Sequence, residues 1–111
     1  DSAIKNYNFN PTRRINLVFG ISYADDIQRA IDVISGIIES DTRSHKDPEP
    51  TIVVGELGSS SVDLITRVWC NSEDYWRLRW DLLKTVKEAF DTEGISIPFP
   101  QTDIHLHNRI D

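Results

Sequence analysis

The sequence predicts an α+β fold in which two amphipathic helices cover one face of a mainly antiparallel sheet. Segments with apolar residues at every second position alternate with two segments whose apolar residues recur every three or four positions. Their order along the chain is strand, helix, strand, strand, helix, strand, which is the split βαβ pattern. We therefore expect a ferredoxin-like two-layer sandwich built as β-α-β-β-α, followed by a terminal strand.

The first residues predict one isolated strand and then a second strand with a more regular apolar alternation. Residues 2–9 alternate until Pro11 ends the pattern. A single strand leaves its backbone N–H and C=O groups without partners of its own, so this stretch does not look like the start of a domain. Residues 14–21 form this second strand, because four apolar side chains share one of its faces: Ile15, Leu17, Phe19 and Ile21.

The first helix is expected to begin at Asp25. Asp25 can cap it, with Gln28 at the reciprocal capping-box position. Asp25 and Asp26 could also be paired carboxylates for acid–base chemistry, but a cap that complements the helix dipole is the simpler interpretation. The helix carries a strong amphipathic stripe: Ile27, Ala30, Ile31, Ile34, Ile37 and Ile38.

A polar loop and two strands are predicted next. Residues 39–50 form the loop, and residues 51–57 form a strand. The Gly- and Ser-rich segment at 55–61 lacks the lysine of a P-loop and precedes a strand, so it indicates a hairpin turn. Residues 61–70 form the third strand, whose apolar face is Val62, Leu64, Val68 and Cys70.

The second helix is expected after Asn71 or Ser72, either of which can cap it. Gly94 offers the positive φ that ends a helix, and two prolines then impose an extended exit before a last strand at residues 102–110. The predicted apolar stripe consists of large residues three or four apart, widened by Leu82 and Ala89: Trp76, Trp80, Leu83, Val86 and Phe90.

Composition excludes several classes of function. A chain of 111 residues suits one domain, and its formal net charge of −6 argues against nucleic acid and anionic membrane surfaces as partners. Cys70 is the only cysteine, so no intrachain disulfide can form. No apolar run approaches the length of about 20 residues that a transmembrane helix needs. We expect the chain to be a piece of a longer protein.

No catalytic or cofactor-binding constellation is apparent. His105 and His107 share a strand face, an arrangement that suits two ligands of one metal ion, but a third and fourth ligand are missing nearby, so no metal site is expected. Cys70 lacks a neighbouring base and is expected to act as a small buried hydrophobe. Trp69, Trp76 and Trp80 could stack on bases, but core packing is the expected role for most of them. The residues thus indicate a non-catalytic module that binds or assembles.

Several stretches resemble the cytoplasmic C-terminal region of the small-conductance mechanosensitive channel (MscS) family. Their order and spacing over nearly the whole chain make the resemblance specific. They are Asn6-Tyr7, Pro11-Thr12-Arg13-Arg14, Gly20-Ile21-Ser22-Tyr23, the segment from Gly55 to Ser61, Arg67-Val68-Trp69-Cys70-Asn71-Ser72, Trp80-Asp81-Leu82-Leu83-Lys84, and Phe90 to Gln101.

The resemblance implies a place in a cage below a channel pore in a bacterial inner membrane. Such a cage is a homo-oligomer, commonly of seven copies, and ions and small solutes pass through openings in its wall. Residues 1–12 would end a truncated β domain, residues 13–101 would form the α/β cytoplasmic domain, and residues 102–111 would join an inter-subunit barrel. Membrane contact would come only through N-terminal helices absent from this sequence. The residues implied in assembly are Tyr7, Phe99, Ile104, His105, Leu106 and His107.

A second hypothesis comes from a different class of function. A ferredoxin-like module could instead bind a small regulatory ligand between helix and sheet. That role requires a concave pocket with a cluster of polar groups at its open edge. The sequence alone identifies no such cluster.

Overall fold

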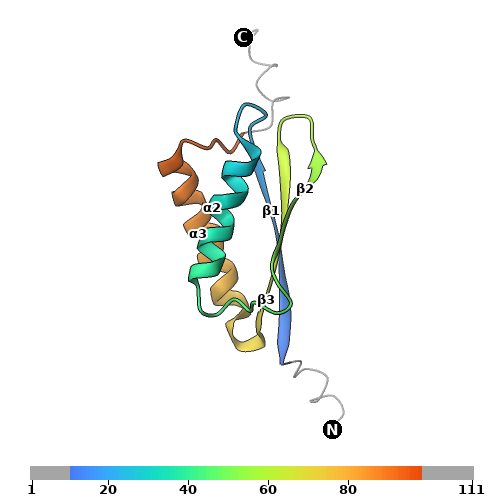
Figure 1. Ribbon diagram of the computed structural model, residues 1–111, viewed down its shortest axis with the longest axis vertical. Coiled ribbons are helices and arrows are strands. Elements are labelled where there is room, and N and C mark those ends of the chain that lie inside the picture. The colour runs from blue at the N-terminus through green and yellow to red at the C-terminus, as the bar shows by residue number, and fades with distance from the viewer. Residues whose placement is uncertain (1–10, 99–111) are drawn as a thin grey trace, which may run out of the picture.

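The computed structural model describes residues 11–98, which form two layers with both helices on one face of the sheet (Figure 1). The predicted β-α-β-β-α order and α+β class are confirmed, whereas the strand expected at 102–110 lies outside the described residues. The elements are β1 (Thr12–Ile21), α2 (Ile27–Ser40), β2 (Thr51–Leu57), β3 (Val62–Asn71), the 3-10 turn η1 (Ser72–Asp74) and α3 (Tyr75–Glu93).

The sheet has the order β1-β3-β2, and both neighbouring pairs are antiparallel. The strands β1 and β2 therefore run parallel with β3 between them, which is the split βαβ arrangement. Ile15 pairs with Val68 in one ladder, and Val53 pairs with Ile65 in the other. The second ladder shifts register at Gly55, where β2 has one extra residue.

One core lies between the sheet and the two helices. Alternate residues of β1 and β3 point into it, as predicted, and Thr66 joins them. The rings of Phe19 and Phe90 meet edge to face, with centroids 6.3 Å apart. Cys70 is completely buried on the predicted face, and this burial, followed by the charge of Asp74, raises the pKa of its thiol.

The first helix begins one residue later than the sequence suggested. Asp26, not Asp25, is the N-cap, and its Oδ1 accepts a hydrogen bond of 3.1 Å from the Arg29 amide. Gln28 bonds to the side chain of Asp32 and closes no capping box. Either aspartate satisfies the sequence pattern, so the path of the chain out of β1 decides which one caps the helix.

Asp25 instead fastens the segment that leaves α3. Its Oδ2 accepts bonds from the amides of Ser22, at 3.2 Å, and Ser96, at 2.8 Å. The Ser22 amide also donates to the Ser96 carbonyl, and Ile95, which precedes Ser96, is buried. One carboxylate thus fixes the exit from the domain against the end of β1.

The second helix buries a different stripe from the predicted one. Its buried residues are spaced by four: Leu78, Leu82, Val86 and Phe90. Trp76, Trp80 and Leu83 are 53%, 59% and 41% exposed, so their assignment to the core is wrong. The sequence contains two overlapping stripes that share Leu82, Val86 and Phe90, and the large size of the tryptophans favoured the wrong one.

The predicted cap at the start of α3 and the predicted end of the helix compare differently with the structure. The chain passes through η1 before the helix, and the side chain of Asn71 makes no cap bond there. Its Oδ1 lies 3.0 Å from Nε2 of His45 instead, so of the two expected caps, Asn71 or Ser72, the first is wrong. Gly94 ends the helix with a φ of 74°, as predicted.

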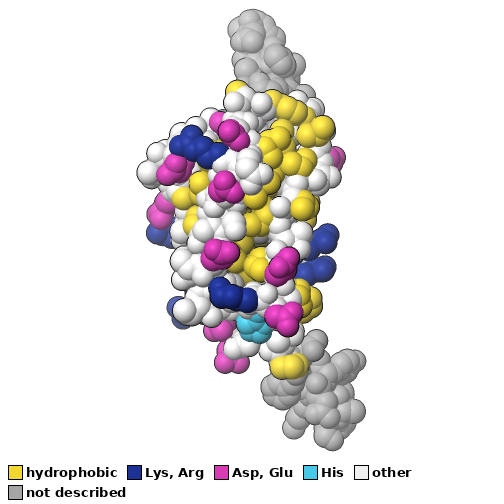
Figure 2. All heavy atoms as spheres, in the orientation of Figure 1, with side chains coloured by type: hydrophobic (Ala, Val, Ile, Leu, Met, Phe, Trp, Pro, Cys, Tyr) yellow, Lys and Arg dark blue, Asp and Glu magenta, His cyan; other side chains and the backbone are white. Residues whose placement is uncertain are grey.

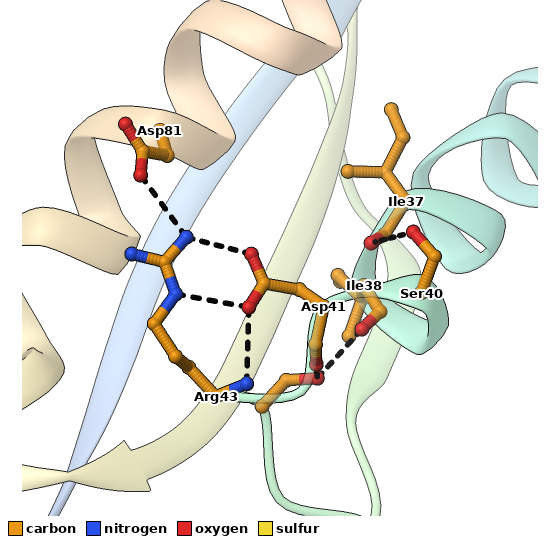
Figure 3. A network of polar contacts seen from close by, with 7 residues as sticks. Ile37, Ile38, Ser40, Asp41, Arg43 and Asp81 are labelled. Atoms are coloured by element: carbon orange, nitrogen blue, oxygen red, sulfur yellow. Dashed lines mark hydrogen bonds and ion pairs between the residues drawn. The ribbon is translucent and has the colours of Figure 1, made fainter.

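An arginine ties the loop after α2 to α3 (Figure 3). Arg43 donates to both carboxylate oxygens of Asp41, with distances of 2.9 and 2.7 Å, and its Nη2 also reaches Asp81 at 3.0 Å. The hydrogen bond from Arg43 holds the pKa of Asp41 below its usual value. The loop is therefore fixed at its first turn, and the residues that follow it have a defined path.

This network predicts a pH-dependent effect of replacing Asp41 with asparagine. The amide can still accept from the Arg43 backbone but loses the ion pair, so the variant should be less stable at pH 7 by about 0.5–1.5 kcal/mol. Because the folded pKa of Asp41 is lowered, its contribution is present above the unfolded value and disappears as the pH falls through the folded one. Urea midpoints at pH 7 and at steps below about pH 4 measure the difference. A difference independent of pH would contradict a role for the charge.

Candidate functional site

The most prominent unexplained feature of the surface is a row of aromatic side chains on the first two turns of α3. We call Tyr75, Trp76 and Trp80 the aromatic row. The rings of Tyr75 and Trp76 meet at 87° with centroids 5.0 Å apart, and those of Trp76 and Trp80 lie 5.9 Å apart. Both tryptophans are more than half exposed. Such a patch on a small domain is typical of a contact surface.

The row is held rigidly by the elements beneath it. Tyr75 packs partly against the core, and the guanidinium of Arg13 on β1 lies 3.6 Å from the centre of its ring. One turn further, Nη1 of Arg79 donates a 3.1 Å bond to the carbonyl of Asn16, also on β1. Two cations from different elements thus fix α3 against β1, so the tryptophans are presented by a fixed helix face.

Leu83 continues the exposed apolar surface along α3, and charged pairs border it. Lys84 bonds to Glu88 at 2.8 Å, and Lys87 bonds to Asp91 at 2.6 Å. The bond to Glu88 raises the pKa of Lys84. A central apolar strip with charged neighbours is the usual composition of a protein contact area.

The face of the sheet opposite the helices is a second exposed surface. Val18, Ile65 and Val53 follow one another across the three strands by the observed registers. Val18 and Val53 are 57% and 48% exposed, and further apolar side chains gather over the end of β2, as Figure 2 shows. No helix covers this face within residues 11–98 (Figure 1).

The predicted assembly residues are not among those that the structure describes. Tyr7, Phe99 and the four residues from Ile104 to His107 all lie outside residues 11–98. Their role in assembly therefore stays a prediction. Within the described range, no group of three or more His, Cys, Asp or Glu residues could hold a metal ion.

The three tryptophans were expected mostly in the core, and the structure separates them. Trp69 is half-buried on the open face of the sheet, where Arg14 lies 6.0 Å from its ring centre. Trp76 and Trp80 form the aromatic row. The sequence did contain a signal for that surface, because the spacing of Leu78, Leu82 and Val86 already defines a complete apolar stripe without them.

The split βαβ fold and the rigid aromatic row define a small α+β module suited to assembly. A family model described as "Mechanosensitive ion channel MscS, C-terminal" matches residues 15–97. The match extends over more than half of the chain. The chain therefore belongs to the MscS family of mechanosensitive ion channels.

Individual relatives agree with this assignment. The chain is 43% identical over 106 residues to an uncharacterized MscS family protein of Synechocystis sp., and 38% identical over 107 residues to a small-conductance mechanosensitive channel of Edwardsiella ictaluri. Each alignment covers 96% of this chain but only 36% and 37% of those relatives. The chain therefore spans little more than a third of their length.

A solved structure supports the fold. The crystal structure of Helicobacter pylori MscS in its closed state matches with a TM-score of 0.76 and 33% sequence identity, covering 81% of this chain and 36% of that one. Among the helices of residues 11–98, none has the length and apolar content needed to cross a membrane.

Proposed function

We propose that this chain forms a subunit of the cytoplasmic cage of a mechanosensitive channel, where it is non-catalytic. In this role it supports assembly of the oligomer and leaves a path for ions and small solutes to the pore. Membership of the MscS family supports the channel context. The aromatic row supports the assembly role, and it is the single observation that carries that part of the proposal.

The physical argument starts from the cost of exposed aromatic surface. Two tryptophans that are more than half exposed leave a large apolar area in water. Burying such area lowers the free energy by about 25 cal/mol for each Å². Tryptophan and tyrosine are also the residues most enriched at the energetic centres of protein interfaces. Because Arg13 and Arg79 hold α3 in place, little ordering is needed when a second copy docks.

The proposal extends to the two ends of the chain. Residues 1–12 would close a truncated β domain, residues 13–101 would form the α/β domain, and residues 102–111 would pair with the same strands of other subunits in a barrel. A closed barrel leaves no strand edge unpaired. A heptamer is the expected oligomer, located at the cytoplasmic side of a bacterial inner membrane, with Tyr7, Phe99 and residues 104–107 among its contacts.

Replacing Trp76 and Trp80 together with serine in the full-length channel should reduce recovery of the intact oligomer. The loss follows because the apolar contact area disappears while the buried stripe of α3 is untouched. Size-exclusion chromatography with multi-angle light scattering on the purified channel measures the oligomer fraction. Deleting Thr102–Asp111 should reduce it independently, since that change removes the proposed barrel.

The matched control replaces both tryptophans with phenylalanine, which keeps an aromatic surface and should preserve the oligomer. The melting temperature of the 111-residue chain should be nearly unchanged by the serine variants and by the deletion. An intact oligomer in the serine variant would remove the aromatic row from the proposed interface. Unfolding of the isolated chain by the deletion would place residues 102–111 in the domain's own sheet.

A further inference from the structure

A cavity of about 350 Å³ lies where the second half of α2, the loop after it and the start of β2 meet. This volume falls within the range of small-molecule sites in proteins. Its apolar lining comes from Ile38, Pro50 and Ile52. The cavity lies between helix and sheet, the position that the small-ligand hypothesis required.

The wall formed by the loop is fixed by its own hydrogen bonds. The Ser44 hydroxyl is buried and lies 2.6 Å from the carbonyl of Ile38 and 2.8 Å from that of Asp41. The next amide, of His45, donates a 2.8 Å bond to the carbonyl of Trp69 on β3. The loop is therefore joined to both the helix and the sheet, and this side of the cavity exists before any ligand binds.

His45 is also held in one orientation. Its Nε2 lies 3.0 Å from Oδ1 of Asn71, so this nitrogen carries the proton when it donates to the amide oxygen. In the neutral ring the other nitrogen, Nδ1, then remains an acceptor. The imidazole thus has a defined position in the cavity lining.

The remaining polar groups carry charges of both signs. Glu39, Lys46 and Glu49 line the same cavity, and none of their side chains forms a hydrogen bond or ion pair within residues 11–98. Figure 2 shows acidic and basic side chains interspersed around a histidine on this face. Two carboxylates and one ammonium beside an apolar wall can pair with opposite charges on one small molecule.

We propose that this cavity binds a small zwitterion whose ammonium and carboxylate groups are separated by a short apolar chain. The ammonium pairs with Glu39 and Glu49, the carboxylate pairs with Lys46, and the methylene groups lie against Ile38 and Ile52. A simple cation leaves Lys46 without a partner, and a simple anion meets two carboxylates. Binding here is separate from the aromatic row and goes beyond the cage role.

The test titrates the 111-residue chain, labelled with nitrogen-15, with three molecules of matched length. These are 4-aminobutyrate, butylamine and butyrate, which carry both charges, only the positive one and only the negative one. The zwitterion should give saturable amide shifts at Ser35, Ser44, Lys46 and Glu49 in the low-millimolar range. The two singly charged molecules should bind about tenfold more weakly, because each lacks one of the two charged groups that the cavity pairs with.

Variants separate the site from general charge effects. Lys46→Gln should weaken the binding of 4-aminobutyrate by about tenfold and remove the preference over butylamine. Glu49→Gln should reduce the preference over butyrate, and replacing Glu39 with glutamine as well should remove it. Glu56→Gln, an exposed acid on β2 outside the cavity lining, should leave the titration unchanged. Equal affinity for the three molecules, or no saturable shift at the cavity residues, would overturn the proposal.

Discussion

Replacing Phe90 with alanine is expected to lower the free energy of unfolding by about 3–5 kcal/mol. The side chain is completely buried in the last turns of α3, and its ring meets that of Phe19 edge to face. The substitution removes the ring and leaves a cavity between helix and sheet, which the surrounding side chains fill only in part. A domain of this size has a total stability of about 5–15 kcal/mol, so the variant should lose a large share of it.

Urea or guanidinium unfolding of the 111-residue chain measures this loss, and Trp80→Ala on the same helix is the matched control. Trp80 belongs to the stripe that the sequence suggested but is 59% exposed, so its removal should change the free energy of unfolding by less than about 1 kcal/mol. The pair therefore distinguishes the two stripes of α3. A loss below 1 kcal/mol for Phe90→Ala, or a larger loss for Trp80→Ala, would mean that α3 is rotated from the observed orientation.

The fold was largely predictable because local patterns and global packing agree in most elements. The alternation of Ile15, Leu17, Phe19 and Ile21 allows only one buried face for β1, and the same holds for β3. The end of α3 was predictable from Gly94, which adopts the positive φ that a glycine tolerates best.

Errors occurred where two local solutions were equally good. Asp25 and Asp26 both fit the start of α2, and only the hydrogen bonds to Ser22 and Ser96, distant in sequence from one another, separate their roles. On α3 the two apolar stripes differ by a rotation of the helix, which the sheet decides through packing. Tertiary contacts selected the outcome in both cases, and a single sequence does not contain them explicitly.

The candidate sites were less predictable than the fold for a related reason. The aromatic row was assigned to the core because large apolar residues are usually buried there, although Trp76 and Trp80 lie outside the buried stripe. The cavity beside α2 has lining residues from two elements and a loop, including Glu39, Lys46 and Ile52. No spacing in the sequence brings such a set together, since the bonds of Ser44 and His45 determine the loop path.

Replacing Gly55 with alanine is expected to lower the free energy of unfolding by about 1–3 kcal/mol. Gly55 is the bulged residue of β2, where the register with β3 shifts between Val54 and Glu56. A Cβ atom built there would lie 2.1 Å from Cγ1 and 2.8 Å from Cδ1 of Ile65, far inside van der Waals contact. Either the Ile65 side chain must leave its position across the bulge, or the β2–β3 ladder must separate locally.

Two further variants show whether that contact is the cause. Gly36→Ala makes the same chemical change in the interior of α2, where an added Cβ meets nothing within 4 Å, so it should raise stability by about 0.5–1 kcal/mol. Ile65→Ala should make Gly55→Ala nearly harmless, because the atoms that the new methyl group meets are then absent. A double-mutant cycle from denaturant midpoints gives this coupling. A coupling near zero, with Gly55→Ala still destabilising, would show that the backbone of the bulge and not Ile65 requires glycine.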